Sequence, residues 1–161
     1  MNPYVTRVNT LAPRASFFAY ESEKLAATGD KSLSSRHLSL EGLWKFHFVK
    51  HHYDAPKNFH AAGYDDTDWV QFPVPGLFEL NGYGDIIYKN IGYAWATQFT
   101  PNPPYIEEKN NYTGSYRKEF EIPADWKGEQ IVMHVGSATS NLTLWVNGKE
   151  VGYSEDSKDA A

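Results

Sequence analysis

The chain has 161 residues, of which 16% are aromatic and none is cysteine, and its formal net charge is −5. This length suffices for one domain that buries roughly 70% of the surface of its unfolded chain. The absence of cysteine excludes disulfides, thiolate metal sites and a cysteine nucleophile. Scattered Lys and Arg provide no basic stripe for nucleic acid or anionic lipid, and no apolar run approaches the ~20 residues of a membrane span.

The N-terminal part of the chain shows little sustained periodicity. We therefore expect residues 1–37 to form an arm that lies over a domain comprising residues 38–161. Within this arm, residues 22–27 have room for a helical turn or two, and the polar sequence TGDKSLSS at 28–35 is typical of a surface loop.

The domain begins with alternating side chains. Trp44, Phe46 and Phe48 alternate with Lys45 and His47, which is the period of a half-buried strand. Similar patterns predict three further strands, which are residues 69–72 (stopped by Pro73 and Pro75), 116–122 and 131–135.

A β-hairpin is predicted near the C-terminus, where Asn147-Gly148 separates two apolar alternations. Both residues tolerate the positive φ of a type I′ turn, so this dipeptide is a strong hairpin signal. A two-residue turn pairs Val146 with Lys149, Leu144 with Val151 and Leu142 with Tyr153. The pairing predicts one core face, which is made of Leu142, Leu144, Val151 and Tyr153.

These elements predict an all-β fold, a jelly-roll or galactose-binding-like β-sandwich with antiparallel strands and long connections. The longest connection, residues 73–114, is rich in Pro, Gly and Asn but also in Tyr, Trp and Phe. A loop of this length in a compact domain is usually functional, and its aromatic content argues against disorder.

No catalytic group emerges from the residues alone. His47 and His51 would share one strand face while His52 points away, so a metal site there is disfavoured. Glycosidases need two carboxylates about 5 to 9 Å apart, whereas neighbours on extended chain point in opposite directions. The adjacent pairs Glu107-Glu108 and Glu155-Asp156 are therefore interpreted as solvated loop charges.

Four blocks of sequence carry a family resemblance. They are SLEGLWKFHF, FPVPGLFELNGYGDIIYKNIGY, NPPYIEEKNNYTGSYRKEFEIPADW and LWVNGKEVGYSEDSK, in this order. Together with the lead-in NPYVTRVNTLAPRASFFAYES, they resemble the amino-terminal sugar-binding domain of the β-galactosidases of glycoside hydrolase family 2. The resemblance covers nearly the whole chain.

The resemblance implies a many-domain enzyme in which a TIM barrel and two immunoglobulin-like domains accompany this one. Both catalytic carboxylates belong to the barrel, so the 161-residue chain alone is expected to be inactive and to contain no catalytic residue. The family's first domain continues past the GYSEDSK loop, so this chain is expected to lack the last strands of its jelly roll. The resemblance also implies a soluble protein, cytoplasmic or periplasmic in a bacterium, that can form a homo-oligomer.

Two residues are assigned substrate contacts by the resemblance. Asn90, in YKNIGY, and Asp156, in GYSEDS, match positions at which loops of this domain complete the galactose subsite. An amide can donate to and accept from sugar hydroxyls, and a carboxylate can accept two hydroxyl protons. The same aspartate helps bind sodium in relatives, and the family also uses magnesium, whereas the fragment itself is expected to hold no cofactor.

Three alternatives remain open at this point. The parent enzyme could be a β-glucuronidase or a β-mannosidase, which share the architecture. The chain could instead be a non-catalytic carbohydrate-binding module, which would present stacking Trp or Tyr on an exposed sheet face, or a purely structural domain, which would present a flat apolar patch.

Overall fold

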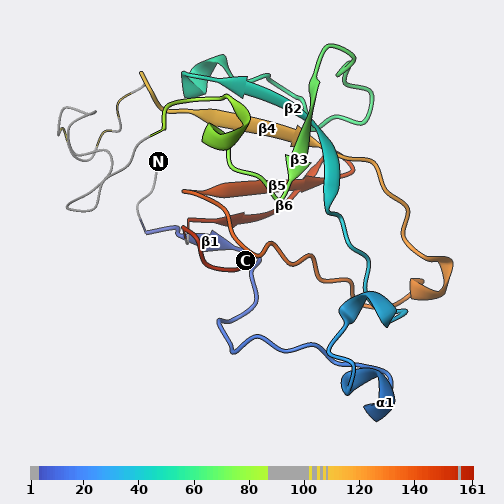
Figure 1. The fold of residues 1–161 in the computed structure, drawn as a ribbon. Coiled ribbons are helices and arrows are strands. Elements are labelled where there is room, and N and C mark those ends of the chain that lie inside the picture. Colours follow the sequence, from blue (N-terminus) through green and yellow to red (C-terminus); the bar gives the residue numbers. More distant parts are fainter. Residues whose placement is uncertain (1–3, 87–101, 103–104, 106, 108, 156) are drawn as a thin grey trace. The chain divides into compact units, whose positions relative to one another are not determined.

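The computed structural model describes residues 4–161 except for 87–101, 103–104, 106, 108 and 156 (Figure 1). The strands are β1 (Arg7–Val8), β2 (Gly42–Val49), β3 (Val70–Val74), β4 (Thr113–Arg117), β5 (Leu142–Val146) and β6 (Lys149–Ser154). The helical elements are α1 (Glu23–Ala26) and the 3-10 turns η1 (Lys31–Leu33), η2 (His52–Asp54), η3 (Glu79–Asn81) and η4 (Ala124–Trp126). With two antiparallel sheets and little helix, the predicted all-β sandwich class is confirmed.

The chain divides into two compact units. The first unit comprises residues 1–40 and 120–161 and contains the three-stranded sheet β1-β6-β5. The second unit comprises residues 41–119 and contains the three-stranded sheet β3-β2-β4. The division into an arm of residues 1–37 and a domain of residues 38–161 stays a prediction.

The core of the second unit is aromatic, and Phe46 lies at its centre. Phe46 and Phe72 are each only 1% exposed, and their ring centroids are 4.4 Å apart. The ring of Phe46 also lies 4.8 Å from that of Tyr116 and 5.0 Å from that of Tyr83. The predicted alternation of β2 is thus confirmed, because its aromatic side packs on the other strands and its polar side faces away.

The hairpin of the first unit forms around the predicted turn. Asn147 and Gly148 have φ values of 50° and 80°, and Val146 pairs with Lys149 as expected. A β-bulge follows, because Trp145 pairs with Glu150 whereas Leu144 pairs with Gly152, which leaves one extra residue on β6.

This bulge changes which side chains share a face. Tyr153 stands opposite Thr143, and Ser154 stands opposite Leu142. The predicted pairs Leu144–Val151 and Leu142–Tyr153 are therefore wrong, and Tyr153 does not share a face with Leu142, because one inserted residue reverses the alternation of every residue beyond it.

The other three strand predictions are partly wrong in their extent. The strand predicted at 69–72 begins at Val70 and continues through Pro73, which is tolerated because β3 is an edge strand. The strand predicted at 116–122 ends at Arg117. The strand predicted at 131–135 does not form, and of these residues only Val135 has backbone hydrogen-bond partners in the described part of the chain, which it finds at Ala161.

Short polar interactions shape the segment before β2. Ser22 caps α1 by accepting a hydrogen bond from the Leu25 N–H at 3.2 Å. The Glu21 carboxylate accepts hydrogen bonds from the Ser35 N–H, the Ser35 hydroxyl and the Ser34 hydroxyl. Hydrogen bonds from its own backbone and from these serines lower the pKa of Glu21 to about 2, so this carboxylate stays ionised while it orders the 34–35 segment.

Gly114 provides a test of the aromatic core. A Cβ at this position would lie 2.7 Å from Phe78 and 2.8 Å from Phe46, whereas a Cβ at Gly63 would meet nothing within 4 Å. We expect Gly114→Ala to lower the free energy of unfolding by about 1–3 kcal/mol through overpacking. Urea denaturation measures this change, and Gly63→Ala is the matched control. Equal stability of the two variants would contradict the packing described for Phe46.

Candidate functional site

Neither substrate-contact residue assigned by resemblance lies in the described part of the chain. Asn90 falls within 87–101, and Asp156 is itself outside the described residues. The described residues on either side of Asn90 belong to the second unit, and those on either side of Asp156 belong to the first unit.

The residues beside Asp156 are held by hydrogen bonds on both sides. On the N-terminal side, the Glu155 N–H donates to the Thr6 carbonyl at 2.9 Å, and the Tyr153 hydroxyl donates to the Glu155 carboxylate. On the C-terminal side, the Ser157 N–H donates to the Glu155 carbonyl at 2.8 Å, and the Lys158 N–H donates to the Ala138 carbonyl at 2.9 Å. Glu155, Ser157 and Lys158, which lie on either side of Asp156, are therefore each held by a backbone hydrogen bond.

Tyr153 remains a hydrogen-bond donor over a wide pH range. Its removal from water, and then its hydrogen bond to the Glu155 side chain, raise the pKa of Tyr153 to about 12. Because the hydroxyl keeps its proton at neutral pH, one oxygen of the Glu155 carboxylate is engaged within the protein.

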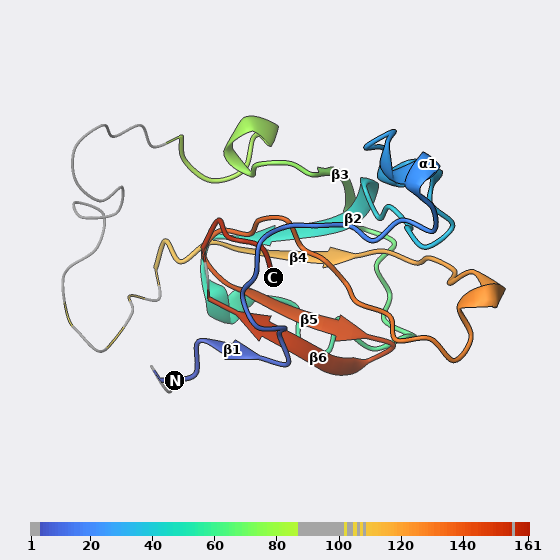
Figure 2. The same ribbon diagram turned by 90° about the horizontal axis from the view of Figure 1, so that it is seen from below.

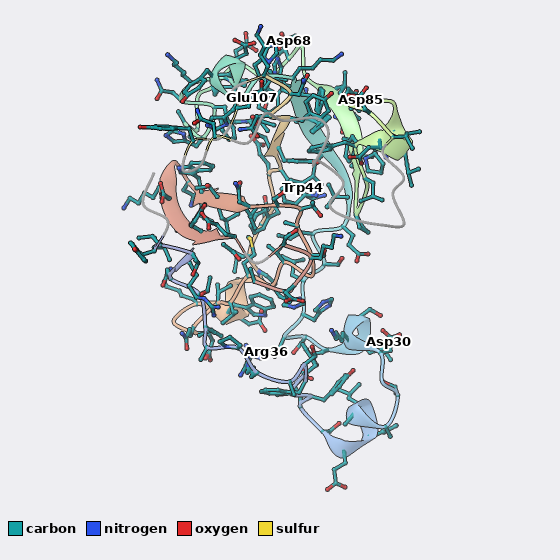
Figure 3. All side chains as sticks on the ribbon, turned by 90° about the vertical axis from the view of Figure 1, so that its left-hand side faces the viewer. Asp30, Arg36, Trp44, Asp68, Asp85 and Glu107 are labelled. Atoms are coloured by element: carbon teal, nitrogen blue, oxygen red, sulfur yellow. The ribbon has the colours of Figure 1, made fainter. Side chains whose placement is uncertain are left out.

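Asn90 belongs to the connection between β3 and β4, and the described residues of this connection on either side of it contact the second unit. Asp85 and Glu107, labelled in Figure 3, are described residues on either side of positions 87–101. The Tyr112 hydroxyl donates to the Asp85 carboxylate, and this hydrogen bond raises the pKa of Tyr112. The Tyr112 ring also lies 5.5 Å from that of Phe48 on β2. Both ends of this connection are therefore attached to the second unit.

Gly84 permits this attachment. A Cβ at Gly84 would approach the Tyr112 ring to 3.0 Å, and the residue has a φ of +71°. A larger residue would be strained in this backbone conformation and would push Tyr112 away from Asp85.

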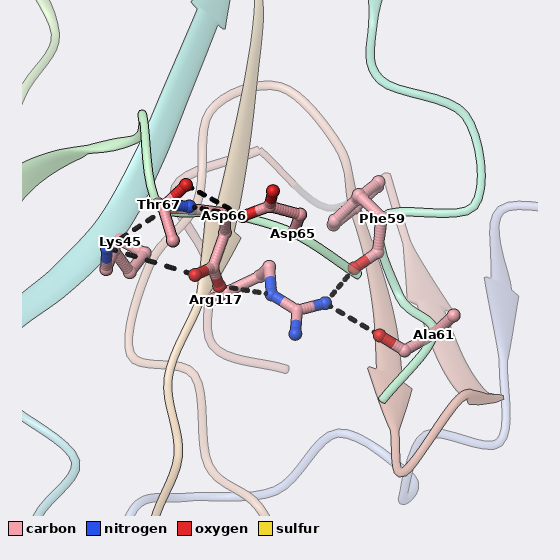
Figure 4. A network of polar contacts seen from close by, with 7 residues as sticks. All are labelled: Lys45, Phe59, Ala61, Asp65, Asp66, Thr67 and Arg117. Carbon is pink, nitrogen blue, oxygen red and sulfur yellow. Dashed lines mark hydrogen bonds and ion pairs between the residues drawn. The ribbon is translucent and has the colours of Figure 1, made fainter. Parts of the chain in front are cut away.

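A second polar network, shown in Figure 4, lies on the side of β2 and β4 that is opposite Phe46, where the Arg117 guanidinium also lies 5.6 Å from the centroid of the Tyr64 ring. Arg117 Nε donates to Asp66 Oδ2 at 2.7 Å, and Arg117 Nη1 donates to the carbonyls of Phe59 and Ala61. Lys45, the cross-strand partner of Arg117, donates to the Asp66 carbonyl at 3.0 Å. These contacts bind residues 59–66 to the sheet, and the Asp66 carboxylate lies 2.7 Å from Arg117 Nε and 3.8 Å from Lys45 Nζ.

Sequence reasoning did not identify this network. In the sequence, Arg117 is only one polar residue of a predicted strand, and its partner Asp66 is 51 positions away. No local spacing connects the two residues, so only the fold brings them together.

The histidines considered as metal ligands lie in ordinary polar or aromatic surroundings. The His47 ring lies 5.5 Å from that of Trp69, and His52 Nδ1 lies 3.3 Å from the Thr113 hydroxyl. Among the described residues, no three His, Asp or Glu side chains are placed to hold a metal ion. None of the described helices is long and apolar enough to cross a membrane.

Comparison with known proteins identifies the class to which this fold belongs. Residues 37–161 match the family described as "Glycosyl hydrolases family 2, sugar binding domain". The chain belongs to this family.

Similar full-length proteins are bacterial β-galactosidases. The chain is 37% identical to the β-galactosidase of Halalkalibacterium halodurans over 95% of this chain and 15% of that protein. It is 33% identical to the β-galactosidase large subunit of Leuconostoc lactis over 97% of this chain and 26% of that protein. It is 31% identical to the β-galactosidase of Priestia megaterium over 97% of this chain and 15% of that protein. The chain thus spans about a quarter or less of the length of these relatives.

Arg117→Met tests whether the polar network stabilises the second unit. The variant keeps the length of the side chain but leaves the Asp66 carboxylate and two carbonyls without their Arg117 donors. We expect it to lower the free energy of unfolding by about 2–3 kcal/mol, measured by urea denaturation.

Arg36→Met is the matched control for this change, because Arg36 is exposed and its side chain bonds to no described residue (Figure 3). Its stability should stay within about 0.5 kcal/mol of the wild type. Similar losses in the two variants would show that the Arg117 network contributes little.

Proposed function

We propose that this chain is the N-terminal sugar-binding domain of a β-galactosidase that hydrolyses terminal non-reducing β-D-galactose residues in β-galactosides. The observation that carries the proposal is the family match over residues 37–161, combined with relatives named β-galactosidase that align with 95–98% of the chain. These names favour β-galactosidase over β-glucuronidase or β-mannosidase. They also favour a domain of an enzyme over an independent carbohydrate-binding module.

In this proposal the chain contributes substrate contacts and the longer enzyme contributes catalysis. Asn90 offers an amide that can donate to and accept from sugar hydroxyls, and Asp156 offers a carboxylate that can accept two hydroxyl protons. The backbone hydrogen bonds of Glu155, Ser157 and Lys158 support this role, because ordered neighbours reduce the entropy that a binding residue loses when the ligand arrives.

The partners in this proposal are the remaining domains of the same protein, including a catalytic TIM barrel and immunoglobulin-like domains, and further copies of the chain in a homo-oligomer. Asp156 would also help bind a sodium ion, for which oxygen ligands are suitable. A magnesium ion would belong to the longer enzyme, which would work in the cytoplasm or periplasm of a bacterium.

Asp156→Ala in the longer enzyme tests the proposal. Loss of a charged group that bonds to sugar hydroxyls as the transition state forms should lower kcat/KM for an aryl β-galactoside by about tenfold or more. Asp159→Ala is the matched control, since Asp159 is an exposed aspartate three positions further along.

Assays of the same enzyme on aryl β-glucuronides and β-mannosides would test the substrate class. Equal activity of the two aspartate variants would contradict the assignment of Asp156. Preferred cleavage of a glucuronide or mannoside would contradict the β-galactosidase assignment.

A further inference from the structure

The chain contains two Asn-Gly dipeptides, and the structure gives them different surroundings. Asn81-Gly82 lies at the end of η3 in the second unit, and Asn147-Gly148 forms the turn between β5 and β6 in the first unit. Figures 1 and 2 show β5 and β6 side by side, joined by this turn. Each dipeptide places a side-chain amide next to the backbone nitrogen of a residue that has no Cβ to shield it.

An asparagine that precedes glycine can lose ammonia without an enzyme. The glycine nitrogen attacks the side-chain carbonyl carbon of the asparagine to form a cyclic succinimide. The side-chain nitrogen leaves as ammonia, taking up the proton that the attacking nitrogen releases to water. Water then opens the ring, and opening at the side-chain carbonyl gives aspartate, whereas opening at the backbone carbonyl gives isoaspartate. The only co-reactant is water, so the rate depends on whether the two groups of the chain can meet.

Both reacting groups of Asn81-Gly82 are engaged in hydrogen bonds. The Asn81 side-chain amide donates to the Leu77 carbonyl at 2.8 Å. The Gly82 N–H donates to the Glu79 carbonyl at 3.4 Å. Attack requires the side chain to turn away from Leu77 and the nitrogen to leave Glu79, so this dipeptide reacts only after local opening of the segment.

Neither reacting group of Asn147-Gly148 has a hydrogen-bond partner among the described residues. The Asn147 side chain is exposed, so it can change rotamer without breaking a contact of the fold. The ladder of the hairpin closes with the pair Val146 and Lys149, on either side of the dipeptide. The tip of a hairpin also opens more readily than its paired strands, which brings the two groups together more often.

We propose that Asn147 is a site of spontaneous deamidation, and that the fold protects Asn81 from the same reaction. The dipeptide is identical in the two places, so the hydrogen bonds around it make the difference. This site is independent of the proposed function, because it needs only the turn between β5 and β6.

The two products have different effects on the hairpin. Aspartate leaves the backbone unchanged and tolerates the positive φ of the turn, where Asn147 has a φ of 50°. Isoaspartate instead lengthens the backbone of the turn by a methylene group, so a two-residue turn no longer closes with the same geometry. We therefore expect isoaspartate at position 147 to weaken the pair Val146 and Lys149.

Ageing of the folded chain in mildly alkaline buffer tests this site. Peptide mapping by mass spectrometry measures conversion at each asparagine, and an isoaspartate-specific methyltransferase assay distinguishes the two products. We expect conversion at Asn147 to be at least about tenfold faster than at Asn81, because poor placement of the reacting groups lowers the rate by this order or more.

The chain unfolded in guanidinium chloride is the control for local sequence. Without the Leu77 and Glu79 hydrogen bonds, the rates at Asn81 and Asn147 should agree within about threefold. Equal rates in the folded chain, or faster conversion at Asn81, would overturn the proposal. A rate ratio that is the same in the folded and the unfolded chain would also overturn it, because the fold would then protect neither site.

Variants without the side-chain amide give a second readout. Asn147→Asp keeps a side chain suited to the turn but has no amide to lose, so early ammonia release from the folded chain should fall by about twofold or more. Asn81→Asp is the matched control and should leave this release nearly unchanged. Unchanged ammonia release in Asn147→Asp would contradict the assignment of Asn147.

Discussion

The first unit depends on the backbone ladder between the N-terminal segment and the end of β6. This ladder and the Asn9–Val151 hydrogen bond join residues that lie at least 142 positions apart. Ordering so long a connection costs conformational entropy, which the paired backbone groups and the hairpin they extend must offset. Because β1 contains only two residues, its ladder alone specifies the register weakly. The hydrogen bond from the Asn9 side chain to the Val151 carbonyl, just after β1, adds a specific contact.

The second unit uses the two sides of β2 for different purposes. Phe46 and Phe48 face the aromatic core, whereas Lys45 points to the side on which Arg117 holds Asp66. Burial of the Phe46 and Phe72 rings stabilises this unit, since apolar area removed from water contributes about 25 cal/mol per Å². The polar network attaches the connection that contains residues 59–66 to the sheet, through hydrogen bonds that Arg117 and Lys45 donate to it.

Local chemistry explains which elements the sequence predicts correctly. The Asn147-Gly148 turn and the alternation of β2 follow from φ preferences and from side-chain period, and both are confirmed. The bulge at Val151 and the missing strand at 131–135 depend on pairing with distant residues, so periodicity alone cannot predict them. Asn90 and Asp156 were assigned by resemblance, whereas the contact of Asn9 with Val151 becomes visible only in the folded chain.

A domain that supplies only a few sugar contacts should bind its sugar weakly by itself. Two or three hydrogen bonds contribute a net of about 0.5–1.5 kcal/mol each, whereas immobilising a ligand costs at least about 4 kcal/mol. In a complete enzyme, contacts from the other domains offset this cost, and the same hydrogen bonds can then act in the transition state. Calorimetric titration of this chain with lactose tests the claim most directly. We expect a Kd in the millimolar range or weaker, whereas a Kd below about 100 μM would contradict this account and identify an independent carbohydrate-binding module.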